Sequence, residues 1–291
     1  MTCARKHVLV TGASSGIGRA AALRLAAAGR HVYAGVRSDG DAADLAGAAG
    51  NGLVTPVPLD VTNPDQIGAA TAAIAGHVAD NGLDGLVNNA GVGLAAPLEL
   101  LPPDTFRRHL EINVIGQLLV TQAVLPLLRQ ARGRIVMVGS IGVRFAPPFA
   151  GPLDASKAAL TAMGDALRQE LAPWGIRVVL VEPASVNSAA ADKVARQAAD
   201  ALAQWPAAGR ALYQDSFERM LAVMRRREAA GSSPDVVAAT IDRALFAARP
   251  KGSYLTGRFA RRMALISRLP TPALDAVRRA IFRLPAPGSL T

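Results

Sequence analysis

The chain is poor in cysteine, aromatic residues and long apolar runs, and each shortage excludes a class of protein. Among 291 residues the one cysteine, Cys3, can form no internal disulfide, which suits a reducing compartment. No apolar run reaches the ~18 residues of a membrane span, and an apolar strand pattern starts at Val8, which leaves no room for a signal peptide. We therefore expect a soluble, cytoplasmic protein that does not cross a membrane.

The net charge of +10 comes from arginine, since only four of the 32 basic residues are lysines: Lys6, Lys157, Lys193 and Lys251. Alanine is also abundant, which indicates a genomic composition bias. Aromatic residues make up 4% of the chain and form no stacking platform, so we expect no nucleic-acid partner. The basic excess lies in a C-terminal extension, 251–291. Apolar residues stand among its arginines, so it either lies on an anionic membrane or, as we favour, packs on the domain.

Short β-branched runs alternate with longer alanine-rich segments over the first 180 residues. The apolar runs lack polar alternation, which is typical of parallel strands covered on both faces. We expect strands at Val8–Val10, Val32–Val36, Val54–Leu59, Gly85–Val87, Ile135–Val138 and Val178–Val181, with helices near 17–28, 64–80, 103–130 and 153–172. This alternation predicts an α/β protein with a Rossmann-like, doubly wound parallel sheet.

The whole chain, 1–291, is expected to form one such domain. Residues 184–232 are helical in composition and show no strand pattern. An insertion after the sixth strand lies at the carboxyl edge of the sheet, where ligands bind, so we interpret it as a substrate lid. Beyond it, Tyr254–Leu255 fits a short edge strand, and the proline-interrupted tail fits two short helices.

A glycine-rich turn, Thr-Gly-Ala-Ser-Ser-Gly-Ile-Gly at 11–18, follows the first strand and opens the first helix. Glycines let a pyrophosphate approach the positive end of the helix. The turn predicts a dinucleotide site formed by Gly12, Ser14, Ser15, Gly16, Ile17 and Gly18. Arg37 follows the second strand, where it suits a 2′-phosphate, so we favour NADP(H) over NAD(H). A merely solvated arginine is the alternative.

With this turn the chain resembles the short-chain dehydrogenase/reductase family, over at least residues 5–190. The other matching motifs are Asn88-Asn89-Ala90-Gly91, Leu59-Asp60-Val61-Thr62, Asn113, Ser140 and the 182–186 loop, in which Ala184 replaces the usual glycine. The resemblance implies active-site roles for Asn113 and Ser140. It also implies a nicotinamide cofactor that is contacted, beyond the glycine-rich turn, by Asp60, Val61, Asn89, Ala90, Gly91, Lys157, Pro183 and Val186.

One position departs from the family pattern. The family's catalytic pair is Tyr-x-x-x-Lys, and here Lys157 is in register while Leu153 stands at the tyrosine position. Tyrosine would give its proton to the alkoxide that forms in carbonyl reduction, and leucine carries no such proton. Losing one general acid costs about 10²–10⁴ in rate. An apolar side chain therefore stands where the family's proton donor would be, in an otherwise matching motif.

Two side chains are candidate substitute donors. Asp154 is a helical neighbour of Lys157 and could pair with it, although a solvated or ion-paired helix aspartate is the plainer interpretation. Tyr213 lies in the expected lid, where a packing role is the alternative. The four histidines, His7, His31, His77 and His109, show no metal-ligand spacing, so we expect no metal.

These observations predict an NADP(H)-binding enzyme of this family that acts on a hydrophobic alcohol or carbonyl compound with altered proton-donor chemistry. Two alternatives stay open. The scaffold could run a non-redox cyclisation, dehydration or isomerisation, or it could be a catalytically inactive cofactor-binding homologue. The resemblance further implies a homodimer or homotetramer packed through two long central helices.

Overall fold

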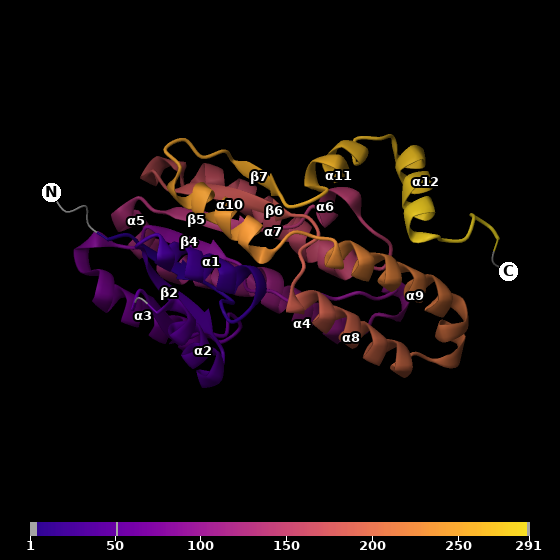
Figure 1. Ribbon diagram of the computed structural model, residues 1–291, viewed down its shortest axis with the longest axis horizontal. Helices are drawn as coiled ribbons and strands as arrows, with labels where there is room; N and C mark the ends of the chain where they lie inside the picture. Colours follow the sequence, from indigo (N-terminus) through magenta and orange to yellow (C-terminus); the bar gives the residue numbers. More distant parts are fainter. Residues whose placement is uncertain (1–4, 51, 290–291) are drawn as a thin grey trace.

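A computed structural model describes residues 5–50 and 52–289, so Cys3 lies outside the described residues. Seven strands form one parallel sheet in the order β3-β2-β1-β4-β5-β6-β7 (Figure 1). They are β1 (His7–Val10), β2 (His31–Val36), β3 (Val54–Pro58), β4 (Gly85–Asn88), β5 (Arg134–Val138), β6 (Arg177–Pro183) and β7 (Ser253–Thr256). The predicted doubly wound sheet is confirmed, and so are all seven predicted strands. The winding reverses between β1 and β4, the point at which ligands bind in such sheets.

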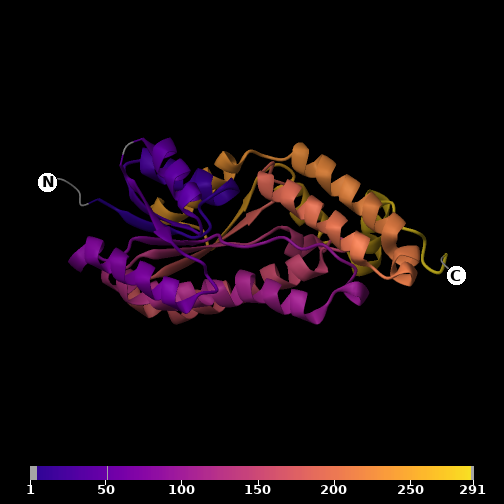
Figure 2. The same ribbon diagram turned by 90° about the horizontal axis from the view of Figure 1, so that it is seen from below.

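Helices cover both faces of the sheet (Figure 2). On one face lie α1 (Gly16–Ala27), α2 (Asp39–Ala49) and α10 (Pro234–Phe246), and on the other lie α3 (Pro64–Val78), α5 (Gly116–Ala131) and α7 (Gly151–Glu170). In β1 the side chains of Val8 and Val10 pack into the apolar core with α1, α2 and α10. Leu9 packs into the core on the opposite face, with α3, α5 and α7. Both faces of the strand are buried, which explains why its apolar run shows no polar alternation.

The predicted helix over 103–130 is interrupted. It consists of α4 (Pro103–Leu110), a π-helical turn at Glu111–Ile115, and α5. Helix α2 was not predicted, because its stretch is rich in glycine and aspartate; Ser38 caps it by accepting a hydrogen bond from the backbone of Asp41.

The combined helix Pro103–Ala131 has the length and the apolar composition of a membrane-spanning helix, whereas we expected no such stretch. Within its most apolar stretch of 18 residues, 39% is buried inside the protein. Its inner face carries Val120, Val124 and Leu128, which pack into the core beneath the sheet. Core helices of globular proteins can have the same length and composition.

A helical cap extends from the carboxyl edge of the sheet (Figure 1). It comprises α8 (Ala189–Gln204) and α9 (Ala207–Ala229), with α6 (Gly142–Phe145), α11 (Ala260–Ile266) and α12 (Thr271–Phe282). A third apolar cluster joins them and includes Phe145, Trp205, Phe217 and Phe282. The predicted short tail helices are confirmed, and the tail packs on the domain, since Leu274 and Phe282 are buried.

Candidate active site

The glycine-rich turn is built against the end of β4. Gly12 and Gly16 have φ of +63° and +54°, which favour glycine. A Cβ on Gly18 would overlap the carbonyl oxygen of Gly12, so the helix could not pack this closely on the turn with any larger residue. The amide of Asn89 donates to the carbonyl oxygens of Thr11 (2.9 Å) and Gly12 (3.1 Å). Asn89 therefore fixes the shape of the turn.

The N-terminus of α1 is open to an anion. Its N-cap residue Ser15 makes no side-chain capping bond, and its first turn contains no acidic residue. In contrast, Ser38, Asn63 and Ser233 cap α2, α3 and α10. Ser14, Ile17 and Ser15 all keep accessible surface beside this end. Free backbone N–H groups and the helix dipole at this site fit the pyrophosphate of a dinucleotide.

Arg37 is exposed just beyond β2, as a group that meets a 2′-phosphate would have to be. Asp60, after β3, accepts hydrogen bonds from the backbone (2.9 Å) and hydroxyl (2.7 Å) of Thr62. Partial burial raises the pKa of Asp60, but these bonds and the charges of Arg37 and Arg108 lower it overall. Asp60 is thus an ionised neighbour of Arg37, and the adjacent Val61 is buried in the core.

Asn113 projects from the π-helical turn and is fully buried. Its oxygen accepts from the backbone N–H of Val92 (2.8 Å), and its amide donates to the carbonyl of Val92 (2.9 Å) and the hydroxyl of Ser156 (3.0 Å). The amide also lies 3.1 Å from Nε2 of His109, whose pKa burial lowers to about 4. π-Helical turns are rare and concentrate at functional sites. Sequence reasoning missed His109, although it stands one helical turn before Asn113.

Lys157 approaches the same place from α7. Its Nζ donates to the carbonyl oxygen of Val138 (2.8 Å), and burial lowers its pKa to about 8. A Cβ built on Gly91 would lie 3.2 Å from Oδ1 of Asn113 and 3.8 Å from Nζ of Lys157. The segment after β4, the π-helical turn and α7 therefore converge on Gly91, beside Ala90, which packs against the glycine-rich turn.

Ser140 follows β5, and its hydroxyl accepts a hydrogen bond from the backbone N–H of Gly142 (2.9 Å). Leu153, in the first turn of α7, is partly exposed, and its carbonyl oxygen accepts from Ser156 (2.7 Å). Among the described residues the hydroxyl of Ser140 donates no hydrogen bond, and the residue is partly exposed. It can therefore donate to a substrate oxygen.

Asp154 does not pair with Lys157, and the expectation of such a pair, or of a solvated aspartate, is wrong. Its side chain is buried, and in the part of the chain that the structure describes Oδ2 has no hydrogen-bond partner. Burial raises the pKa of Asp154 to about 7, although the charge of Arg278 lowers it. Sequence spacing placed Asp154 beside Lys157, but the lysine points to Val138 instead.

The segment that joins β6 to α8 lies beside the glycine-rich turn. Pro183 is buried and accepts at its carbonyl from the backbone of Ile141 (3.0 Å), while Val186 pairs with Ser232. A Cβ on Gly16 would lie 3.7 Å from the Cβ of Ser188. Ser188, which sequence reasoning did not select, thus stands opposite the glycine-rich turn, where a bound nucleotide would pass.

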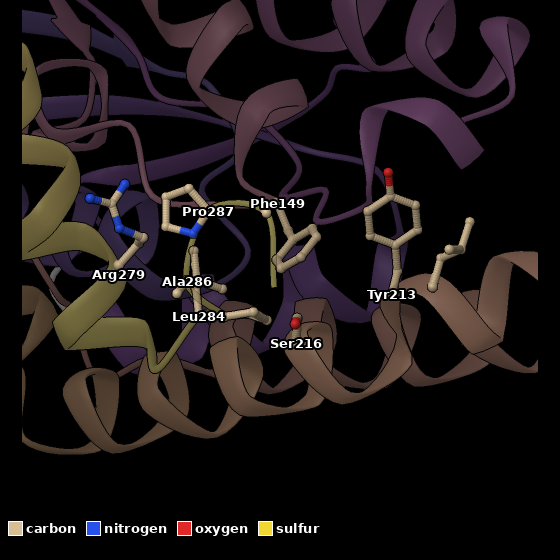
Figure 3. Close-up of a pocket in the computed structure, with 10 residues that line it drawn as sticks. Phe149, Tyr213, Ser216, Arg279, Leu284, Ala286 and Pro287 are labelled. Carbon is tan, nitrogen blue, oxygen red and sulfur yellow. The ribbon is translucent and has the colours of Figure 1, made fainter. Parts of the chain in front are cut away.

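A cavity of about 410 Å³ opens between α9 and the C-terminal tail (Figure 3). Its wall is mostly apolar and includes Phe149, Leu212 and residues 284–288, with Arg279 and Tyr213 among the polar groups. The hydroxyl of Tyr213 donates to Glu99 (2.5 Å), and this bond raises the pKa of Tyr213. The partner that the structure gives this phenol is thus a carboxylate before α4, not a catalytic group.

Comparison with known proteins agrees with this geometry. A family model described as short chain dehydrogenase matches residues 6–199. The chain is 36% identical to retinol dehydrogenase 5 of Mus musculus over 96% of its own length and 89% of that protein. It is 32% identical to estradiol 17-beta-dehydrogenase 2 of Mus musculus, over 98% and 77% of the two chains.

Among solved structures, the chain resembles a short chain dehydrogenase from Burkholderia cenocepacia in complex with NADP, with a TM-score of 0.72 and 27% identity over 94% of this chain and 97% of that one. These matches, together with the site in which Asn113 and Lys157 meet at Gly91, define the class of protein. The chain belongs to the short-chain dehydrogenase family, whose members named here are oxidoreductases.

Proposed function

We propose that this protein is an NADP(H)-dependent dehydrogenase/reductase that interconverts a hydrophobic alcohol and its carbonyl compound. The observation that carries the proposal is the convergence of Asn113 and Lys157 on Gly91, beside a helix N-terminus that is free to bind pyrophosphate. The exposed Arg37 supports NADP(H), because a guanidinium can bind a 2′-phosphate through two hydrogen bonds. Relatives named for retinol and estradiol support a hydrophobic substrate.

The bound nicotinamide would supply the hydride for this chemistry. Lys157 would hold the ribose hydroxyls with its ammonium group, which burial leaves partly deprotonated above pH 8. Ser140 would orient the substrate oxygen and share its developing charge. The buried Asn113 would fix the backbone around Val92 that borders the nicotinamide end.

We further propose that the proton-donor chemistry differs from that of the family. By alignment of the motif ending at Lys157, Leu153 takes the place of the catalytic tyrosine. A leucine here favours a second candidate function, a non-redox reaction or a purely cofactor-binding role, because neither needs a phenol.

The experiment is an assay of purified protein with NADPH against the aldehyde of retinol and the 17-ketone of estradiol. Cofactor binding is followed by protein fluorescence, and turnover by loss of NADPH absorbance. The proposal predicts both binding and stoichiometric NADPH oxidation. Product formed without net NADPH consumption would support the non-redox alternative, and binding without any product would support the inactive homologue.

We also propose a homodimer or homotetramer packed through α5 and α7. The outer face of α7 exposes small side chains at Ala155, Ala158, Ala159, Ala162 and Ala166, which permit close helix approach. Light scattering of Ala159→Arg and Ala162→Arg variants tests this, since an arginine on the contact face should yield monomers.

A further inference from the structure

The first turn of α7 presents a carboxyl group to the segment after β5 that contains Ser140 and Gly142. Asp154 is 9% exposed, and Pro152, two residues earlier, is also buried. No cation forms an ion pair with Asp154 among the described residues: Arg278 of α12 bonds to Asp275 (2.7 Å) and to the carbonyl of Phe145 (2.7 Å), and Lys157 bonds to Val138 (2.8 Å). A buried carboxyl group without a paired cation favours its protonated, neutral form.

Asp154 and Ser140 border the same small space. A Cβ built on Gly142 would overlap Oδ1 of Asp154 and would lie 3.0 Å from Oγ of Ser140. Any side chain at position 142 would therefore crowd both oxygens. Glycine leaves the space between Oδ1 of Asp154 and Oγ of Ser140 free of a side chain at this position.

Asp154 and Ser140 both have hydrogen-bonding sites that no described residue uses. Oδ2 of Asp154 is buried and has no partner in the described part of the chain. Ser140 accepts one bond from the backbone of Gly142, which leaves one lone pair to accept a proton and one proton to donate. A protonated carboxyl group and a serine hydroxyl are chemically suited to form a donor chain.

We propose that Asp154 is the proton source for carbonyl reduction and delivers its proton through the hydroxyl of Ser140. The inference rests on the proposed redox function. As hydride adds to the carbonyl carbon and the C=O π bond breaks, the substrate oxygen takes the proton of Ser140, and Ser140 takes the proton of Asp154. The products are the alcohol, the oxidised nucleotide and the Asp154 carboxylate, which a solvent proton restores. Ser140 is the catalytic residue, and Asp154 acts through it.

The titration of Asp154 supports this assignment. Burial raises the pKa of Asp154 to about 7. A general acid is most effective when its pKa lies near the pH of the reaction, here neutral pH. Among the described residues, the charge that acts on Asp154 is that of Arg278 from α12, whereas Lys157 on its own helix is bonded to the carbonyl of Val138. Reduction should therefore slow as the pH rises above about 7, and alcohol oxidation should accelerate.

The test compares the wild type with Asp154→Asn, Ser140→Ala, their double variant and the control Asp165→Asn, which removes an exposed carboxylate from the same helix. NADPH oxidation is measured with the aldehyde of retinol and the 17-ketone of estradiol from pH 5.5 to 9. Asp154→Asn should lose about 10²- to 10⁴-fold in kcat with unchanged NADPH affinity, and its rate should no longer fall above pH 7. The double variant should lose no more than Ser140→Ala, and Asp165→Asn should resemble the wild type.

A second readout needs no turnover. If Asp154 is a buried neutral acid, Asp154→Asn should gain thermal stability relative to the wild type as the pH rises from 5 to 8, because the wild type then carries a buried charge. Loss of stability at pH 8 would show an ionised, paired aspartate and would overturn the relay. Wild-type turnover with equal turnover in Asp154→Asn would overturn the relay alone. A wild type that binds NADPH but reduces neither carbonyl compound would overturn the proposed function and the relay with it.

Discussion

Nζ of Lys157 donates a hydrogen bond to the carbonyl oxygen of Val138, 2.8 Å away, and makes no ion pair with Asp154 on its own helix. The bond holds the ammonium group of Lys157 away from the carboxyl group of Asp154, although the two residues are three positions apart in the sequence. It leaves the ammonium at the end of β5, where the ribose of a nucleotide would pass, and leaves the carboxyl group to the loop around Ser140. The site therefore has two distinct titrating groups with different neighbours.

Arg37→Ala tests the cofactor preference. An exposed arginine that binds a 2′-phosphate contributes a charge-assisted pair, so the variant should bind NADPH about 2 kcal/mol more weakly and NADH almost unchanged. Titration of protein fluorescence with both nucleotides measures this. The variant Arg19→Ala, which loses a surface bridge to Asp44, is the matched control. Equal losses for NADPH and NADH would contradict the assignment.

Leu153→Tyr tests whether a phenol at this position adds to the proton supply that we assign to Asp154 and Ser140. Positions 153 and 157 share a helix face, so the new phenol would stand beside Lys157. Reduction of generic hydrophobic ketones should rise, at most by the ~10²–10⁴ of a general acid and by less if the relay through Ser140 already supplies the proton. Leu153→Phe, which adds the ring without the hydroxyl, controls for shape. A folded, NADPH-binding tyrosine variant with no gain over the phenylalanine variant would favour the non-redox alternative.

The histidines at the amino edge of the sheet predict acid sensitivity. Burial lowers the pKa of His7 and His31, whose rings stack 5.5 Å apart. The unfolded chain therefore binds more protons, and the free energy of unfolding should fall as the pH drops through 6.5. Each histidine should contribute less than ~1 kcal/mol, since both are partly exposed. Urea unfolding at pH 7.5 and 5.5 measures the effect, and His31→Gln should reduce it; an unchanged pH dependence in that variant would refute the explanation.

The C-terminal tail should stay on the protein. Phe282 packs 6.3 Å from the ring of Phe145, and Leu274 is also buried, whereas Leu265 is exposed. We predict no co-sedimentation with anionic liposomes at low salt. Binding that disappears in a Leu265→Ser variant would instead support a membrane-surface contact.

Much of the fold could be predicted because the apolar runs of β1 to β6 mark strands buried on both faces. The turn at Gly12–Gly18 could be predicted because its glycines are required by its geometry. The π-helical turn around Asn113 could not, because such turns are rare and the composition of 103–130 fits one continuous helix. Nor could the approach of Arg278 to Asp154, since it depends on how the tail folds back onto α6, where Arg278 bonds to the carbonyl of Phe145.

The most direct test of the account is isotope transfer from the cofactor. Wild-type protein is incubated with the 17-ketone of estradiol or the aldehyde of retinol and NADPH deuterated at either face of nicotinamide C4. We predict that one of the two labelled forms places deuterium on the carbinol carbon of the alcohol, with one NADP⁺ formed for each product. A product without deuterium from either form, or formed with no NADP⁺, would contradict the assignment of this protein as a redox enzyme.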